Sequence, residues 1–196
     1  GTETGQQNSH HDRKRSFCRR LLSSADIPAD GKRIINMERI RKIQEHPLFR
    51  EQYELLQDAE KDRIFCGHSM AHFADVARLM YIYSLEDHAG LDRSLIYAAA
   101  LLHDIGRYEQ ISLGTPHHLS GARIAGEILA DCGFSAGEIS AVQDAVKSHR
   151  KASDESAPPL SRYLYRADKQ SRNCFCCPAK EECDWPDTKK NLYFTY

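Results

Sequence analysis

The chain has 196 residues, of which 41% are hydrophobic, 9% aromatic and 28% charged, and its mean hydropathy is −0.60. A chain of this length and mix suits one domain with a single core and argues against a long multidomain protein. The longest apolar run, residues 96–102, falls far short of the roughly 20 residues that cross a bilayer. Because 27 basic and 28 acidic residues nearly cancel, no net field steers the chain toward a polyanion. We therefore expect no membrane span and no general affinity for nucleic acid.

Cysteine and histidine usage is unusual in this chain. It holds seven cysteines, four of them between residues 174 and 183, and ten histidines. An odd cysteine count without a cleavable hydrophobic N-terminal segment argues against a disulfide framework. We therefore expect a cytoplasmic protein with reduced thiols, some of which bind metal.

Residues 1–36 differ in composition from the rest of the chain. They contain a polar run at residues 5–11 and a basic cluster made of Arg13, Lys14, Arg15, Arg19 and Arg20. Since Gly1 is not a natural first residue, we expect a loosely ordered leader or a segment added for expression. An arm for nucleic acid or anionic lipid is the alternative, but charge runs this short are usually solvated. The main domain is expected over residues 37–173, with a cysteine-rich tail at residues 174–196 packed on it.

Helical periodicity begins at Met37, and no run of the following sequence shows convincing strand alternation. A first helix is expected over residues 37–45. It stops before Pro47, which can itself be the first residue of a second helix. The pattern predicts an all-α fold.

A long third helix is expected to begin near Asp62, which can act as its N-terminal cap. Its apolar positions, from Phe65 to Tyr83, recur at intervals of three and four residues. His68 and His72 would then lie one turn apart on the same face of this helix.

The second half of the chain contains the most apolar helix. Residues 93–104 are apolar almost all round, so this helix is expected at the centre of the core, with Gly106 ending it. Three more helices are signalled by capping residues or prolines, over residues 120–131, over residues 135–149 and from Pro159 onward.

His103 and Asp104 stand together at the end of the central apolar helix. Burying both side chains without partners would cost several kcal/mol. A hydrogen-bonded structural pair or a bound metal ion would remove that cost. The dipeptide alone leaves both interpretations open.

The wider pattern resembles the HD-domain metal-dependent phosphohydrolase superfamily, which is named for its His, His-Asp and Asp ligands. His72, the His103-Asp104 pair and Asp168 follow in that order and in helical contexts. The resemblance covers roughly residues 64–172 and includes four matching segments, at residues 101–107, 117–122, 147–149 and 167–172. It implies an HD-type helical bundle.

The resemblance also implies a metal-binding role for six side chains. His72, His103, Asp104 and Asp168 would hold a first ion. His117 and His149 match the dinuclear branch, in which Asp104 would bridge two ions and which includes bacterial hydrolases that cut diadenosine tetraphosphate symmetrically. Such mixed imidazole and carboxylate ligands suit divalent ions, with iron expected and manganese or zinc as alternatives. The segment after Asp168 reads Lys-Gln-Ser-Arg here, where that branch usually has Glu-Pro.

Several neighbouring side chains are expected to act on substrate. A metal ion lowers the pKa of bound water to about 7, and Asp104 would hold or deprotonate that water. The cations expected to neutralise charge on phosphate are Arg107, Lys169 and Arg172. His68 is expected to donate a hydrogen bond to substrate, and His118 to contact phosphate or to support a ligand. The glutamate of a zinc-protease motif is missing between His68 and His72, which excludes that class.

The tail holds a second group of metal-type residues. Cys174, Cys177 and Cys183 have C-x2-C-x5-C spacing, and Cys66 is the best candidate for a fourth ligand. Tetrahedral zinc would be the usual occupant. The spacing also resembles the cluster loop of iron–sulfur DNA glycosylases, so a [4Fe–4S] cluster is an alternative, as is a set of reduced thiols without metal.

The function expected from this resemblance is hydrolysis of a phosphoester or phosphoanhydride. The substrate would be a small phosphorylated molecule, such as a nucleotide or a dinucleoside polyphosphate. A di-iron oxygenase of the same fold and a non-catalytic nucleotide-binding sensor are the alternatives. A homodimer is compatible with the sequence.

Overall fold

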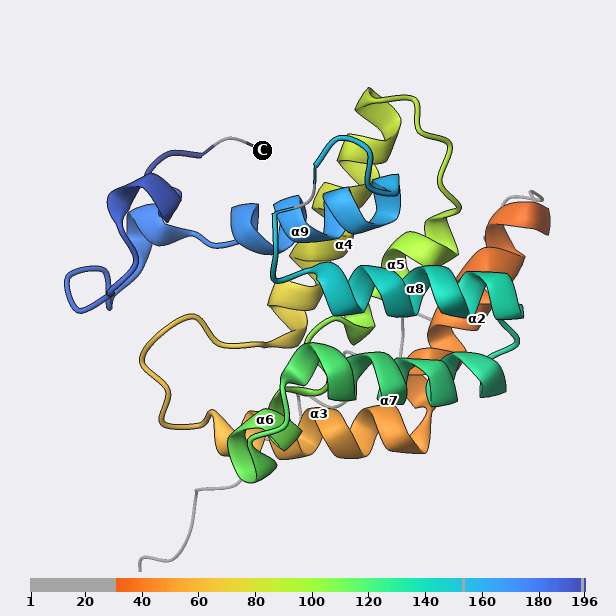
Figure 1. Cartoon of the computed structure of the whole chain (residues 1–196), viewed down its shortest axis with the longest axis horizontal. Helices are drawn as coiled ribbons and strands as arrows, with labels where there is room; N and C mark the ends of the chain where they lie inside the picture. The colour runs from red at the N-terminus through yellow and green to blue at the C-terminus, as the bar shows by residue number, and fades with distance from the viewer. Residues whose placement is uncertain (1–30, 153, 195) are drawn as a thin grey trace, which may run out of the picture. The chain divides into compact units, whose positions relative to one another are not determined.

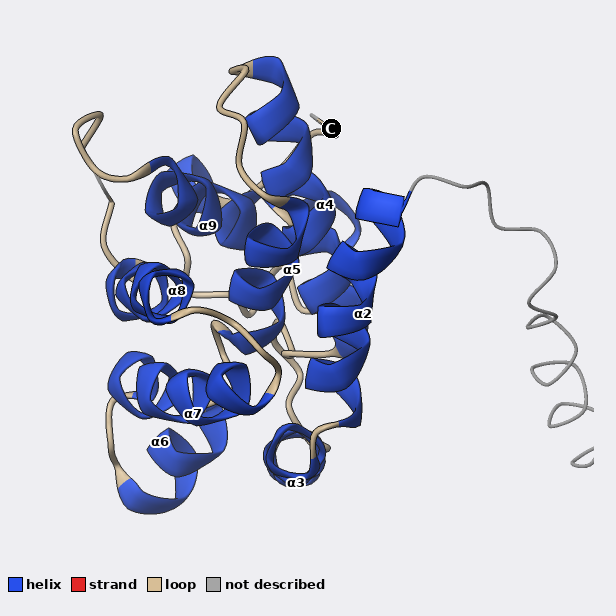
Figure 2. Ribbon diagram, turned by 90° about the vertical axis from the view of Figure 1, so that its right-hand side faces the viewer, coloured by secondary structure: helices blue, strands red, loops and turns tan. Residues whose placement is uncertain are grey.

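The computed structural model describes residues 31–152, 154–194 and 196. Within these residues the chain forms helices and loops and no strand, so the predicted all-α class is confirmed (Figures 1 and 2). The α-helices are α2 (Gly31–Glu45), α3 (Pro47–Ala59), α4 (Met70–Glu86), α5 (Arg93–Leu102), α6 (Arg107–Leu113), α7 (His117–Asp131), α8 (Ala136–Ser148) and α9 (Pro159–Gln170). Two short 3-10 turns follow, η1 (Cys174–Cys176) and η2 (Asp187–Lys189).

Helix α5 lies at the centre of the bundle and contacts α4, α7, α8 and α9. Its three consecutive alanines, Ala98–Ala100, are fully buried. Small side chains let neighbouring helices approach closely, and the larger Ile96 and Leu102 fill the remaining space. The position predicted for this helix is confirmed, and it brings residue 103 into the middle of the fold.

The third predicted helix begins later than the sequence indicated. Helix α4 starts at Met70, and the Ser69 side chain caps it by accepting a hydrogen bond from the backbone N–H of His72 at 3.3 Å. Asp62 lies in a turn and Phe65 in a loop, where its side chain is 40% exposed. The prediction of a cap at Asp62 is wrong, because the helix begins at Met70 and the Ser69 side chain supplies its cap. His68 therefore precedes the helix.

Two other helix starts also differ from the predictions. Helix α2 begins at Gly31, six residues before the expected domain start at Met37, and α7 begins at His117 rather than at Ser120. The predicted leader otherwise falls on residues 1–30, which lie outside the described residues. In α7, Pro116 supplies the non-helical residue before the first turn.

Gly106 does not end α5 in the manner predicted. The helix ends at Leu102, and residues 103–106 form a tight turn before α6. A Cβ at Gly106 would lie 2.3 Å from the backbone nitrogen of Gly121 and 2.5 Å from the carbonyl oxygen of His117. Glycine is therefore required here by the close approach of two backbones, and this contact holds the turn against α7.

The chain after α9 folds back on the bundle with little regular structure. Asn191 donates hydrogen bonds to the carbonyl oxygens of Lys169 and Arg172 at 2.7 and 2.8 Å, and Tyr196 packs on Tyr83. None of the helices in the described ranges is long and apolar enough to cross a membrane.

Candidate metal centre

Six side chains from α4, α7, α9 and the ends of α5 and α8 converge inside the bundle. They form two groups of potential ligand atoms, each within 4.8 Å of one another, and the groups share Asp104. The first group is His72, His103, Asp104 and Asp168, and the second is Asp104, His117 and His149. All six are buried. The structure therefore brings together every side chain that the sequence placed at the metal centre.

The four imidazole rings of this centre each have a hydrogen-bond partner at Nδ1. His103 and His149 point Nδ1 at the carbonyl oxygens of Ala100 and Val146, at 2.8 and 2.6 Å. Each of these residues ends its helix, so the free carbonyls of the last turn are within reach of its ring. Because the carbonyls accept the Nδ1–H, each ring turns its Nε2 toward the centre.

The other two rings are oriented by side chains. The Nδ1 of His117 bonds to the Oε1 of Gln110, and the Nδ1 of His72 lies 3.1 Å from the Ser171 hydroxyl. Neither Gln110 nor Ser171 was singled out by the sequence, because neither forms a motif with its histidine. Both act through the ring that they hold.

Asp104 presents a different oxygen to each group of ligands. Its Oδ2 lies 3.1 Å from the Nε2 of His103, while its Oδ1 lies 3.3 and 3.6 Å from the Nε2 atoms of His117 and His149. Asp168 completes the first group, with its Oδ1 3.5 Å from the Nε2 of His72. A carboxylate placed in this way can bridge two ions.

The donor set fits divalent metal ions. The buried Nε2 of His103 lies 3.1 Å from Asp104 Oδ2 and 3.8 Å from Asp168 Oδ1, so a cation can take the place of a proton between these atoms. Neutral imidazole with carboxylate is the mixture that iron, manganese and zinc accept. A first ion would be held by His72, His103, Asp104 and Asp168, and a second by Asp104, His117 and His149.

Burial and charge set the protonation of these ligands. Burial lowers the pKa of His72 to about 4 and that of His117 to about 3, so both rings are neutral at pH 7. Burial also opposes a charge on His103, but Asp104 and Asp168 outweigh it and raise the pKa of His103 to about 9. Burial likewise opposes ionisation of Asp104, yet His103 holds its pKa well below the usual range. A divalent cation would replace the proton that His103 otherwise carries.

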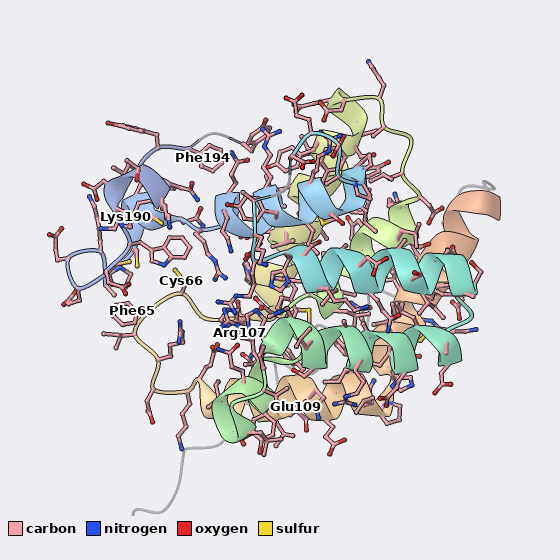
Figure 3. The ribbon with its side chains drawn as sticks, in the orientation of Figure 1. Phe65, Cys66, Arg107, Glu109, Lys190 and Phe194 are labelled. Atoms are coloured by element: carbon pink, nitrogen blue, oxygen red, sulfur yellow. The ribbon has the colours of Figure 1, made fainter. Side chains whose placement is uncertain are left out.

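The three predicted phosphate-binding cations border the centre. Arg107 lies 3.2 Å from Asp104 Oδ1, Lys169 lies 2.5 Å from Asp168 Oδ2, and Arg172 lies 3.4 Å from Asp168 Oδ1 (Arg107 is labelled in Figure 3). Arg172 also contacts His72 Nε2 at 3.2 Å and donates to the Gly67 carbonyl at 3.1 Å. The structure thus places all three beside the ligands.

His68 and His118 lie in different surroundings beside the metal centre. His68 is buried, with its Nδ1 2.7 Å from Glu60 Oε1 and its Nε2 3.4 Å from Asp104 Oδ2. Glu60 also accepts from the backbone N–H of His68 at 2.9 Å, so it fixes this residue at two points. The side chain of His118 packs edge-on against His117, and its buried Nδ1 has no hydrogen-bond partner.

Two further cations lie near the second ligand group. Burial lowers the pKa of His118, and Arg150 and Lys151 lower it further; Arg150 acts in the same direction on His117. The charges of Arg150 and Lys151 therefore make the surroundings of His117 and His118 more positive. The sequence carried a signal for them, because both follow His149 directly.

The predicted cysteine ligands do not join this centre. Cys66 lies in the loop before α4, and Cys174, Cys177 and Cys183 lie in the tail. All described cysteines are free thiols.

Comparison with known proteins identifies the family of this chain. The HD domain family matches residues 70–173, which is more than half of the chain. An uncharacterized protein of Clostridium beijerinckii is 41% identical over 137 residues, covering 70% of this chain and 85% of that protein. The crystal structure of a predicted HD superfamily hydrolase from an uncultured Thermotogales bacterium is similar, with a TM-score of 0.53 and 24% identity over 73% of this chain and 81% of that one. The predicted family is confirmed: the chain belongs to the HD-domain family.

Proposed function

We propose that this protein is a metal-dependent phosphohydrolase that uses two divalent ions to cleave a phosphoester or phosphoanhydride. The observation that carries the proposal is the sharing of Asp104 by two buried groups of ligands. When bound, the ions supply Lewis acidity toward a water molecule and toward a phosphoryl oxygen. The first ion would have four protein ligands and the second three, which leaves open positions on both when the ions accept more than four ligands, as iron and manganese do.

Four side chains would act on the water, the phosphate and the leaving group. Asp104, whose pKa is held well below its usual range, is ionised at neutral pH, so it would hold both ions and orient the attacking water by accepting a hydrogen bond from it. Arg107 and Arg172 would bind the phosphate and stabilise the negative charge that grows on it in the transition state. Lys169, whose side chain is 37% exposed, can reach the leaving group from the solvent side.

A nucleotide is the substrate class that the surroundings favour. A cleft of about 280 Å³ adjoins the centre and shares with it Ser171 and Arg172, which both contact His72. Aromatic and amide side chains line the cleft, among them Phe175, Phe194, Tyr193, Asn173 and Asn191. Nucleobases stack on aromatic rings, at about 1–3 kcal/mol per base. We propose that the base binds in this cleft while the phosphates reach past Arg172 to the ions.

A phosphate-release screen tests the proposed reaction. Protein loaded with manganese or ferrous iron is incubated with mononucleotides, dinucleoside polyphosphates and sugar phosphates, and inorganic phosphate, nucleotide products and oxygen uptake are all recorded. We expect phosphate release from nucleotides without oxygen uptake, and none from Asp104→Ala. Oxygen uptake without any hydrolysis product would point to an oxygenase, and tight nucleotide binding without turnover would point to a sensor; either result contradicts the proposal.

A further inference from the structure

The tail after α9 buries little apolar surface. Between residues 171 and 194 the only regular elements are η1 and η2, and the buried side chains are Cys174 and Ala179. Structureless segments of this length are uncommon in compact domains. Small, loop-rich units of this kind usually depend on disulfides or a metal. The described cysteines form no disulfide, so their thiols are available to bind a metal that would add to the stability of the tail.

Four of the thiols converge between the tail and the loop before α4. Cys174 and Cys177 are linked by a turn in which the backbone N–H of Cys177 donates to the carbonyl oxygen of Cys174 at 3.4 Å. Figure 3 shows the sulfur of Cys66 on the side of its loop that faces the tail, where further sulfur atoms lie. Burial raises the pKa of the Cys66 thiol, and Cys174, Cys177 and Cys183 raise it further, so all three lie within electrostatic range of it.

Cys176 stands apart from these four although it belongs to the same tail. It is exposed, and its thiol contacts the Asn173 carbonyl oxygen at 3.6 Å. Cys176 is therefore set apart from the group, and the other three cysteines of the tail, Cys174, Cys177 and Cys183, are those with the C-x2-C-x5-C spacing.

The absence of a tight group of sulfurs in the described ranges counts against tetrahedral zinc, which is one of the two metal occupants that the sequence left open. Four thiolates on one zinc ion, each at about 2.3 Å, lie about 3.8 Å apart. In the described ranges, the groups of three or more ligand atoms within 4.8 Å of one another are those of the His–Asp centre, so no three of these sulfurs are that close. An iron–sulfur cube separates its cysteines further, because each binds a different iron at a corner.

The surroundings of the four thiols also suit an anionic cluster. Arg172 acts on Cys66 in the sense that favours its thiolate, and Arg63 donates to the Cys66 carbonyl oxygen at 3.0 Å. Lys190, in the same tail, has a side chain that is only 11% exposed. Four thiolates on an iron–sulfur cube carry net negative charge, which nearby cations offset.

We propose that Cys66, Cys174, Cys177 and Cys183 bind one [4Fe–4S] cluster that fastens the tail to the loop before α4. Cys66 is two residues from His68, and Cys174 is two residues from Arg172. Between them, Arg172 donates to the carbonyl oxygen of Gly67 at 3.1 Å. The cluster therefore clamps the two segments that bring His68 and Arg172 to the metal centre. Its role is structural, and it takes no part in the hydrolysis.

Acid-labile sulfide is the measurement that tests the cluster, because the His–Asp centre contains none. The full chain is reconstituted without oxygen from ferrous iron and sulfide, desalted, and analysed for sulfide, iron, zinc and visible absorption. We expect about four sulfides per chain and the broad visible band of an iron–sulfur cluster. One zinc per chain without sulfide, or no metal beyond the His–Asp centre, would overturn the proposal. This result does not depend on hydrolase activity.

Serine variants assign the ligands. Cys177→Ser and Cys66→Ser should each lose most of the sulfide, while the matched control Cys176→Ser should keep it. Far-ultraviolet circular dichroism checks that the helices of each variant persist. Equal loss in Cys176→Ser, or full retention in Cys66→Ser, would contradict the proposed ligand set. If a variant fails to fold, the sulfide count of the unaltered chain still decides the question.

Limited proteolysis tests the clamp. Trypsin should cut at the tail residues Lys180 and Lys189 at least several-fold faster after the cluster is removed, since local opening exposes the backbone. Equal rates with and without the cluster would show that the tail is held by other means.

Discussion

The Nε2 atoms of His117 and His149 lie 3.2 Å apart, although the residues are 32 positions apart in the chain. Each ring donates its Nδ1–H elsewhere, His117 to Gln110 and His149 to the Val146 carbonyl. The two Nε2 atoms therefore face each other as lone pairs, which repel unless a cation lies between them. Two nitrogen donors at about 2.1 Å from one ion are about 3 Å apart, so the observed distance is that of ligands on a common metal.

The second ion should depend on this pair of histidines. His149→Ala is expected to reduce the metal content from about two ions per chain to about one, because the first ligand group stays complete. His118→Ala is the matched control, since His118 neighbours His117 but belongs to neither group. Elemental analysis after dialysis measures the difference. Equal metal contents in the two variants would show that the second group is not a metal site.

Arg172 should affect substrate more than metal. Losing its charge removes hydrogen bonds to phosphate that are worth about 1.5–3 kcal/mol, so Arg172→Ala should raise KM by about 10- to 100-fold. Arg172→Lys should recover part of the loss, and Lys147→Ala, at an exposed position of α8, should have no effect. Steady-state kinetics and metal analysis are run on the same preparations. Loss of the metal in Arg172→Ala would assign the residue to the metal site instead.

The aromatic cleft should distinguish nucleotides from other phosphates. Phe175 and Phe194 form an edge-to-face pair with ring centroids 6.3 Å apart. Phe175→Ala is expected to raise KM for a nucleotide about 10-fold through lost stacking, and to leave KM for a sugar phosphate unchanged. Comparing the two substrates with one variant cancels any general effect on the catalytic centre. An equal rise in both KM values would show that the base does not bind in this cleft.

Gly106 should be the most sensitive glycine of the domain. In Gly106→Ala the new Cβ would meet backbone atoms at 2.3 and 2.5 Å, which cannot move without separating residues 103–106 from α7. We expect a loss of at least about 2 kcal/mol in the free energy of unfolding. Gly137→Ala is the control, because a Cβ there meets nothing within 4 Å and alanine favours the helix. Urea denaturation compares the two, and equal stabilities would mean that the close approach is not rigid.

The metal-free protein should be most stable near pH 6.5. Below that pH the unfolded chain protonates His72 and His117, whose folded pKa values are only about 4 and about 3, so stability falls as the pH drops toward 4. The pKa of His103 is raised to about 9 in the folded state, so its contribution is full below pH 6.5 and is lost as the pH rises toward 9.

Urea unfolding of metal-stripped protein between about pH 4.5 and 9.5 measures this curve. His103→Ala should flatten its alkaline side and leave the acidic side in place. A curve that rises steadily to pH 9 in the unaltered chain would show that His103 does not carry a proton in the metal-free fold.

Much of the fold could be predicted from local pattern. The apolar run at residues 96–102 indicated a central helix, and Pro47 and Pro159 marked helix starts that the structure keeps. The error at Asp62 arose because apolar spacing continued through Phe65, although the capping hydrogen bond is made by Ser69. Periodicity does not say which of two capping residues the tertiary structure uses.

Some residues of the candidate site could be predicted from the sequence and others could not. The position of His103 and Asp104 at the end of an apolar helix indicated that they need partners, and the resemblance to the HD-domain family identified them as metal ligands. Glu60 and Gln110 were not identified, since each bonds its histidine across a loop, from eight and seven residues earlier in the chain, and forms no motif with it. Such partners are set by loop conformation, which the sequence pattern does not encode.

The most direct test counts manganese on the metal-stripped chain, because manganese prefers imidazole and carboxylate over thiolate and so avoids the tail cysteines. An anaerobic titration should show about two tightly bound ions per chain and the onset of phosphate release as the second binds. In Asp104→Ala both ions and the activity should be lost. A single site in the unaltered chain, or two occupied sites in Asp104→Ala, would contradict a centre built on one shared carboxylate.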